Sequence, residues 1–199
     1  MKHGATNYNP ETTNTNRVDH KVMTRVTIFG SSQPKPTEPL YQEAYELGKQ
    51  LALSGVTICN GGYGGTMEAS AKGAVEADGK TTGVVCERFG VAANPFIQEK
   101  IIVNTHSERL HKLIELGDAY IVLRGSTGTL VELALVWEYM NKSIMPEKPI
   151  IVLGDFWKPV IDTLKNEFVF EGKDFATKYV TLARTIEECM TLLPKELHG

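Results

Sequence analysis

A glycine-rich turn at residues 124–129 combines a cation, two glycines and three hydroxyl side chains, a pattern suited to binding an anion. It follows a short apolar run at residues 119–123, typical of a buried strand, and precedes apolar residues at helical spacing. The free N–H groups at a helix start attract anions, phosphate above all, and glycine lets the backbone come close to them. The turn therefore predicts a phosphate site. Its candidate residues are Arg124, Gly125, Ser126, Thr127, Gly128 and Thr129.

Two charged residues near this turn each have two interpretations. The pattern Thr129-x-x-Glu132 fits a capping box, in which each side chain satisfies a backbone donor at a helix start, so Glu132 could serve the helix alone. Arg109 stands at the start of the predicted helix before the apolar run, where most arginines are solvated surface charges. The residue types alone leave both alternatives open.

Two further turns have the same character and also follow predicted strands. Because the carboxyl ends of parallel strands meet at one edge of a sheet, we expect all three turns to lie together there. A phosphate on one turn, with the rest of a mononucleotide across the others, is consistent with this arrangement. The candidate residues are Gly30, Ser31 and Ser32 in the first turn, and Gly61, Gly62, Gly65, Thr66 and Met67 in the second.

The elements that must position these turns alternate along the chain. This alternation predicts an α/β fold of Rossmann-like type, a doubly wound, mostly parallel sheet with helices on both faces. Residues 1–22 are expected to form a disordered polar leader and residues 23–199 a single domain. Prolines 34, 36 and 39 are expected to hold a loop open before the first helix. Strands are predicted at residues 25–29, 56–59, 82–86, 100–103, 119–123, 149–153 and 179–182, and helices at 41–51, 67–77, 107–116, 130–142, 156–168 and 185–193.

Composition and missing motifs exclude several classes of function. The net charge of −3 gives no electrostatic case for nucleic acid or an acidic membrane, no apolar run approaches a membrane span, and a cytoplasmic location is expected. The three scattered cysteines lack metal-ligand spacing, and no metal or cofactor is predicted. Dinucleotide, P-loop and esterase motifs are absent. His106 and His111 lack the spacing of a helical zinc pair and are interpreted as surface residues.

Three segments resemble the Lonely Guy family, the cytokinin nucleoside monophosphate phosphoribohydrolases. Residues 29–32, Phe-Gly-Ser-Ser, are similar to the family's first-strand turn, and residues 61–67, Gly-Gly-Tyr-Gly-Gly-Thr-Met, resemble its second. Residues 125–132, Gly-Ser-Thr-Gly-Thr-Leu-Val-Glu, resemble its motif P-G-G-x-G-T-x-x-E, and Arg109 stands where the family has the arginine of an Arg-Lys pair. The resemblance covers residues 25–164 or so.

The resemblance implies a homodimeric enzyme that cleaves the N-glycosidic bond of a nucleoside 5′-monophosphate, either AMP or a cytokinin-type nucleotide. Its catalytic residues would be Arg109 and Glu132. The chain departs from the family at four positions. It has Asn60 and Ser126 where the family has glycines, Leu110 where the family has a lysine, and Arg124 where the family has a proline. These departures keep open a second possibility, a protein that binds a nucleotide or another phosphate ligand without hydrolysing it. The residues do not specify which base leaves. The segment 87–99 has no helical or strand periodicity, and we expect it to border the site and to contact the base.

Overall fold

The computed structural model describes residues 25–194, which build one sheet of seven strands that all run parallel. The strand order is β4-β3-β2-β1-β5-β6-β7, so the chain first builds outward from β1 on one side and then returns to build outward on the other. The strands are β1 (Arg25–Phe29), β2 (Thr57–Asn60), β3 (Thr81–Cys86), β4 (Glu99–Val103), β5 (Ala119–Val122), β6 (Ile150–Leu153) and β7 (Val180–Ala183).

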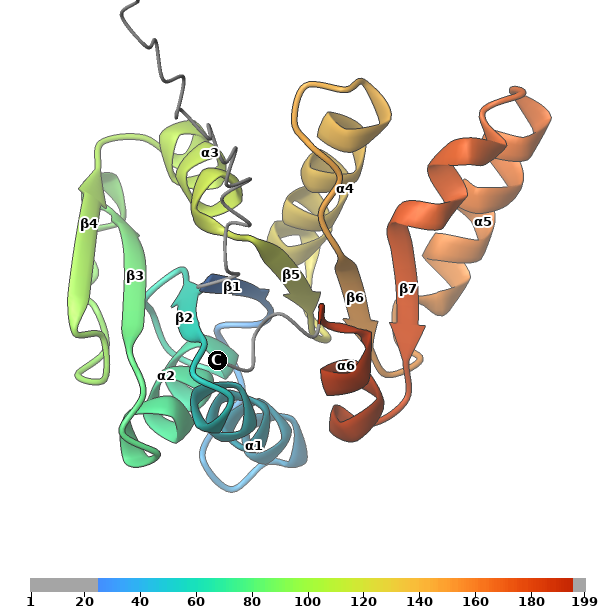
Figure 1. The fold of residues 1–199 in the computed structure, drawn as a ribbon. Helices are drawn as coiled ribbons and strands as arrows, with labels where there is room; N and C mark the ends of the chain where they lie inside the picture. The colour runs from blue at the N-terminus through green and yellow to red at the C-terminus, as the bar shows by residue number, and fades with distance from the viewer. Residues whose placement is uncertain (1–24, 195–199) are drawn as a thin grey trace, which may run out of the picture.

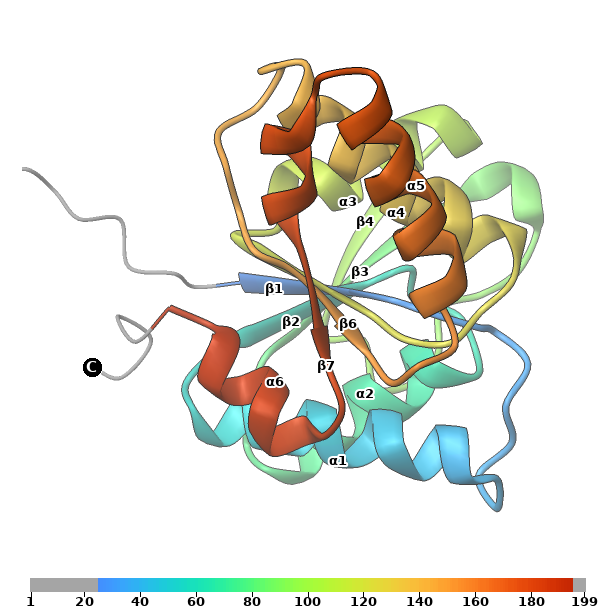
Figure 2. The same cartoon turned by 90° about the vertical axis from the view of Figure 1, so that its right-hand side faces the viewer.

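Helices cover both faces of this sheet, as Figure 2 shows, with α1, α2 and α6 on one face and α3, α4 and α5 on the other. Each layer buries an apolar cluster against the strands. The predicted doubly wound α/β fold is confirmed, and the sheet is parallel throughout. The helices are α1 (Pro39–Leu53), α2 (Thr66–Glu76), α3 (His106–Leu116), α4 (Thr127–Asn141), α5 (Lys158–Phe170) and α6 (Ile186–Leu192), with short 3-10 helices η1 (Glu87–Phe89) and η2 (Asp174–Tyr179).

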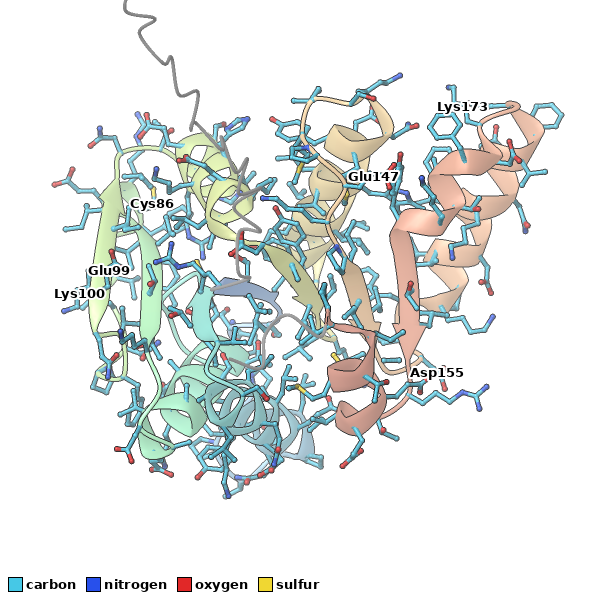
Figure 3. All side chains as sticks on the ribbon, in the orientation of Figure 1. Cys86, Glu99, Lys100, Glu147, Asp155 and Lys173 are labelled. Carbon is cyan, nitrogen blue, oxygen red and sulfur yellow. The ribbon has the colours of Figure 1, made fainter. Side chains whose placement is uncertain are left out.

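The sheet is strongly twisted, as parallel sheets of this size are. In Figure 1 the arrowhead of β4 points up and that of β7 points down. Figure 3 labels Cys86 at the carboxyl end of β3, in the upper left part of the molecule, and Asp155 just beyond the carboxyl end of β6, in the lower right part. Carboxyl ends of strands far apart in the sheet therefore diverge, and a ligand site has to form where neighbouring strands end together.

The neighbouring strands β2, β1 and β5 supply such a place at the centre of the sheet. All four residues of β5 are buried, as are four of the five in β1. Side chains on alternate faces of a strand are buried in both helical layers, which explains why β5 is a continuous apolar run and why β1 has apolar residues at three of its five positions. The turns that follow β1, β2 and β5 are thus anchored on buried strands at the centre of the sheet.

Two details of the predicted elements need correction. Pro39 is the first residue of α1 and does not lie in the loop before it, because proline has no N–H to lose at a helix start and its backbone angle already suits the helix. Helix α4 begins at Thr127, three residues earlier than the apolar spacing indicated. The predicted polar leader at residues 1–22 lies outside the described residues.

Candidate active site

The three glycine-rich turns lie together at the carboxyl ends of β1, β2 and β5, and backbone hydrogen bonds join them. The Ser31 N–H donates to the Arg124 carbonyl at 3.3 Å, and the Thr66 N–H donates to the Ser31 carbonyl at 2.8 Å. Ser31, in the first turn, therefore bridges the second and third. The predicted meeting of the turns at one edge of the sheet is confirmed.

A cavity of about 480 Å³ opens between these turns and helices α3 and α4. This volume lies in the range of small-molecule sites. Nine of the predicted site residues line it, namely Gly30, Ser31, Ser32, Met67, Arg109, Ser126, Gly128, Thr129 and Glu132. Five lining residues were not among those candidates, namely Tyr63, Gly64, Phe89, Val91 and His106.

Arg109 is a buried side chain of this cavity, with 6% of its surface exposed, so its interpretation as a solvated helix charge is wrong. Its Nε donates to the carbonyl of Val84 at 2.9 Å, and its Cζ lies 5.2 Å from the centroid of the Tyr63 ring and 6.0 Å from that of Phe89. The backbone bond and the two rings fix the guanidinium plane and leave other N–H groups for a ligand.

Gly61 makes room for this arginine. A Cβ atom added at Gly61 would lie 1.6 Å from Nη2 of Arg109 and 2.8 Å from its Cζ, so any other residue here would force the guanidinium out of its present position. Gly61 itself does not line the cavity, so its role is to let the guanidinium pack directly on the backbone of the second turn.

Glu132 lies on α4 and faces Arg109, with Oε1 3.8 Å from Nη1. Only 9% of the residue is exposed. Burial raises the pKa of its carboxyl from 4.5 to about 7, although the Arg109 charge acts in the opposite direction. Near neutral pH the group therefore exchanges protons readily, which is the property that a general base requires.

The capping-box interpretation of Glu132 is wrong. Ser126 occupies the cap position of α4, and its side chain makes no capping hydrogen bond. Thr129 and Glu132 are the third and sixth residues of the helix, where Glu132 is too far along to cap its start. Helix capping therefore does not explain why a carboxylate is buried at this position.

The first turn of α4 presents a backbone surface to the cavity. Ser126, Gly128 and Thr129 line it, and a Cβ added at Gly128 would meet no atom within 4 Å. Gly125 packs on Thr129, since an added Cβ would lie 2.1 Å from the Thr129 hydroxyl oxygen. Gly128 therefore faces open space, whereas Gly125 and Thr127, which do not line the cavity, shape the turn.

The second turn is held by a buried asparagine that replaces a glycine of the resembled family. Asn60 donates from Nδ2 to the Met67 carbonyl at 2.9 Å, and its Oδ1 accepts from the Gly62 N–H at 2.8 Å. Gly62 and Gly65 adopt positive φ angles of 77° and 66°, which favour glycine. Gly61, Gly62, Gly65 and Thr66 thus form the scaffold of the turn, while Met67 reaches the cavity.

Two other departures from the resembled family lie away from the cavity. The exposed Arg124 places its Cζ 4.8 Å from the centroid of the Phe156 ring and lines a separate hollow beside α1. Leu110 is buried, with 8% exposure, and does not line the cavity. Among the residues that the structure describes, Arg109 is the one arginine or lysine that lines the cavity.

Some of the missed residues had a signal in the sequence. Tyr63 and Gly64 stand inside the second turn, and Phe89 and Val91 belong to the segment expected to border the site. His106 is exposed, as expected for a surface residue, but it also lines the cavity. No spacing rule linked His106 to the turns, because the contact depends on how α3 packs.

The described residues hold no cluster of three or more side chains that could bind a metal ion. Nor does any helix among residues 25–194 have the length and apolar character needed to cross a membrane.

Comparison with known proteins places this geometry in a family. The model of the SLOG cluster4 family matches residues 23–190. The cytokinin riboside 5′-monophosphate phosphoribohydrolase of Rhodococcoides fascians is 29% identical over 152 residues, which cover 72% of this chain and 75% of that protein. The protein of the same name from Mycobacterium tuberculosis is 32% identical over 137 residues, which cover 66% of this chain and 71% of that protein.

Among solved structures, the molybdenum cofactor binding protein of Rippkaea orientalis is similar, with a TM-score of 0.67 and 26% identity over 85% of this chain and 94% of that one. The molybdenum cofactor carrier protein of Chlamydomonas reinhardtii, at 21% identity and a TM-score of 0.71 over 89% of this chain and 99% of that one, shares the fold. The resemblance to the Lonely Guy family, first drawn from three turns, is thus supported by matches over most of the chain. The chain belongs to the SLOG cluster4 family.

Proposed function

We propose that this protein hydrolyses the N-glycosidic bond of a nucleoside 5′-monophosphate, AMP or a cytokinin-type nucleotide, to the free base and ribose 5-phosphate. The observation that carries the proposal is the ion pair of Arg109 and Glu132 inside the cavity at the three turns. The names of the relatives from R. fascians and M. tuberculosis support the same class of reaction.

The proposed reaction needs a carboxylate where Glu132 lies. Breaking the bond between C1′ and the base develops positive charge on the ribose, which a nearby carboxylate stabilises. With its pKa near 7, Glu132 can also accept a proton from the water that attacks C1′. The free N–H groups at the start of α4 are suited to hold the 5′-phosphate, and Arg109 is suited to hold phosphate or ribose hydroxyl oxygens in a fixed orientation.

A second candidate is a protein that binds a nucleotide or another phosphate ligand without hydrolysis. Two observations favour it. Leu110 stands where the resembled motif has a lysine, so Arg109 is the one arginine or lysine that lines the cavity among the described residues. A structural relative at 26% identity is named for binding the molybdenum cofactor. The cavity geometry is compatible with either candidate function. Whether the bound nucleotide is hydrolysed distinguishes the two.

The deciding experiment is incubation with AMP and other nucleoside 5′-monophosphates, followed by chromatographic assay of free base and ribose 5-phosphate in equal amounts. Base release by the wild-type protein supports the hydrolase. Tight nucleotide binding in calorimetry without base release would favour the second candidate.

Gly128→Val should abolish nucleotide binding without unfolding the protein. The valine Cβ meets no protein atom within 4 Å, so the added methyl groups would project into the space proposed for the phosphate. Calorimetry with AMP measures the affinity. Ala134→Val, on the exposed side of the same helix, controls for the cost of a branched residue in α4. Unchanged affinity for AMP in a folded Gly128→Val protein would show that the phosphate does not bind at this turn.

We also propose a symmetric homodimer that packs through α4. Leu113 of α3 and Trp137 of α4 are buried in the core at 0% and 2% exposure, so they do not form the surface for this contact. Val131, at 43% exposure, is an apolar residue that α4 does present to solvent. We expect a dimer in light scattering at micromolar concentration and a monomer for Val131→Glu, with Val169→Glu on α5 as the control. A wild-type monomer would contradict the proposal.

A further inference from the structure

His106 is the cavity residue to which nothing above assigns a role. It is the first residue of α3 and lies three positions before Arg109, so the two side chains project from one face of the helix, one turn apart. Its ring centroid lies 5.7 Å from that of Phe89, the same ring that the Arg109 guanidinium approaches at 6.0 Å. Phe89 therefore borders both the arginine and the histidine.

These contacts set the order of groups across the cavity. Glu132 pairs with Arg109, Arg109 lies against Phe89, and Phe89 lies against His106. The carboxylate of Glu132 and the imidazole of His106 are thus connected through a guanidinium and an aromatic ring. A nucleotide whose C1′ lies near Glu132 would extend its base toward Phe89, on whose ring a planar base can stack, with His106 beside that ring.

The proposed hydrolysis requires a proton for the departing base. When the bond from C1′ to the base breaks, its electron pair stays on the base, which must then be protonated to leave as a neutral molecule. Tyr63 is poorly placed to supply that proton, because its hydroxyl already accepts from the Cys86 N–H at 2.8 Å and donates to the Cys86 carbonyl at 3.3 Å. Arginine does not release protons in proteins.

We propose that His106 is the acid that protonates the leaving base, an inference that rests on the proposed hydrolase activity. Imidazole gains and loses protons near neutral pH, which suits this task. The imidazolium of His106 gives its proton to a ring nitrogen of the base as the C1′–N bond breaks. Water adds to C1′ and gives a proton to Glu132, so one water is consumed, and exchange with solvent then restores both side chains.

The test compares His106→Gln on two substrates that differ by one methyl group and, through it, in their need for an acid. One is a purine nucleoside 5′-monophosphate, and the other is its N7-methylated form, whose base already carries a positive charge and leaves without a proton. Loss of a general acid should lower base release from the first by about 100-fold or more and leave release from the second nearly unchanged. The exposed His106 can be replaced without disturbing the core.

His111→Gln is the matched control, since His111 is an exposed histidine of the same helix that does not line the cavity. Equal losses on both substrates would overturn the proposal, because they would mean that His106 only holds the base. Unchanged release from both would overturn it too. A wild-type protein that releases no base from either substrate would contradict the proposed function itself, and the two failures are therefore distinguishable.

Discussion

Replacing Glu132 by glutamine should lower base release by on the order of a hundredfold or more, the scale of losing one electrostatic contributor to the transition state. Glutamine has nearly the same shape as the carboxyl group but carries no charge, so the cavity stays intact while the stabilisation of the ribosyl cation is lost. Nucleotide binding should persist, because the phosphate is expected at the start of α4. The measurements are the rate of base release and calorimetric affinity.

The stability of the same variant provides its control. The folded-state pKa of Glu132 is raised, to about 7, so the stability associated with the neutral carboxyl is present at low pH and lost as the pH rises through 7. At pH 8 the wild-type protein carries the cost of a buried charge that glutamine removes. Glu132→Gln should therefore melt above the wild-type protein at pH 8 and close to it at pH 5. If a folded Glu132→Gln protein released base at the wild-type rate, Glu132 would have no catalytic role.

Arg109→Ala should weaken nucleotide binding as well as turnover, with a loss in kcat/KM of roughly 10-fold to 100-fold, the range for hydrogen bonds to charged groups. Arg109 is the one arginine or lysine that lines the cavity within the described residues, and the rings of Tyr63 and Phe89 lie against its guanidinium. Arg109→Lys keeps the charge but not the planar donor set, so it should recover only part of the loss. Steady-state kinetics on all variants measure these effects.

The arginine variants also test whether Arg109 and Glu132 act together. If both serve one transition state, the double variant Arg109→Ala, Glu132→Gln should lose less than the product of the two single losses. Arg88→Ala, which removes an exposed arginine of η1 outside the cavity, is the control for a change of net charge. Multiplicative losses would show that the two residues act independently and would contradict the proposed pairing.

The strand ends and their turns were predictable because each depends on local chemistry. The apolar runs of β1 and β5 are buried on both faces, and glycines with positive φ follow β2, so both signals appear in short stretches of sequence. The topology then brings the turns together by the general rule for parallel sheets. The fold and the location of the site follow from these two facts.

The state of individual side chains was not predictable in the same way. Thr129-x-x-Glu132 has the spacing of a capping box, but α4 begins at Thr127, and the extra residues move Glu132 from the helix start into the cavity. Arg109 is buried because α3 packs beside β3, where Nε donates to the carbonyl of Val84, a residue 25 positions away in the chain. Such contacts arise from helix packing, which local spacing does not encode.

The close approach of Gly61 to Arg109 has a consequence for how this site can change over evolution. Any side chain at position 61 would overlap the present position of the guanidinium, so a substitution there requires the arginine to move or to be lost. The dependence runs in one direction, because the glycine can stay when the arginine is replaced. A lineage that has gained a side chain at position 61 would have to restore the glycine before an arginine could pack in this place again, which ties the history of the second turn to that of α3.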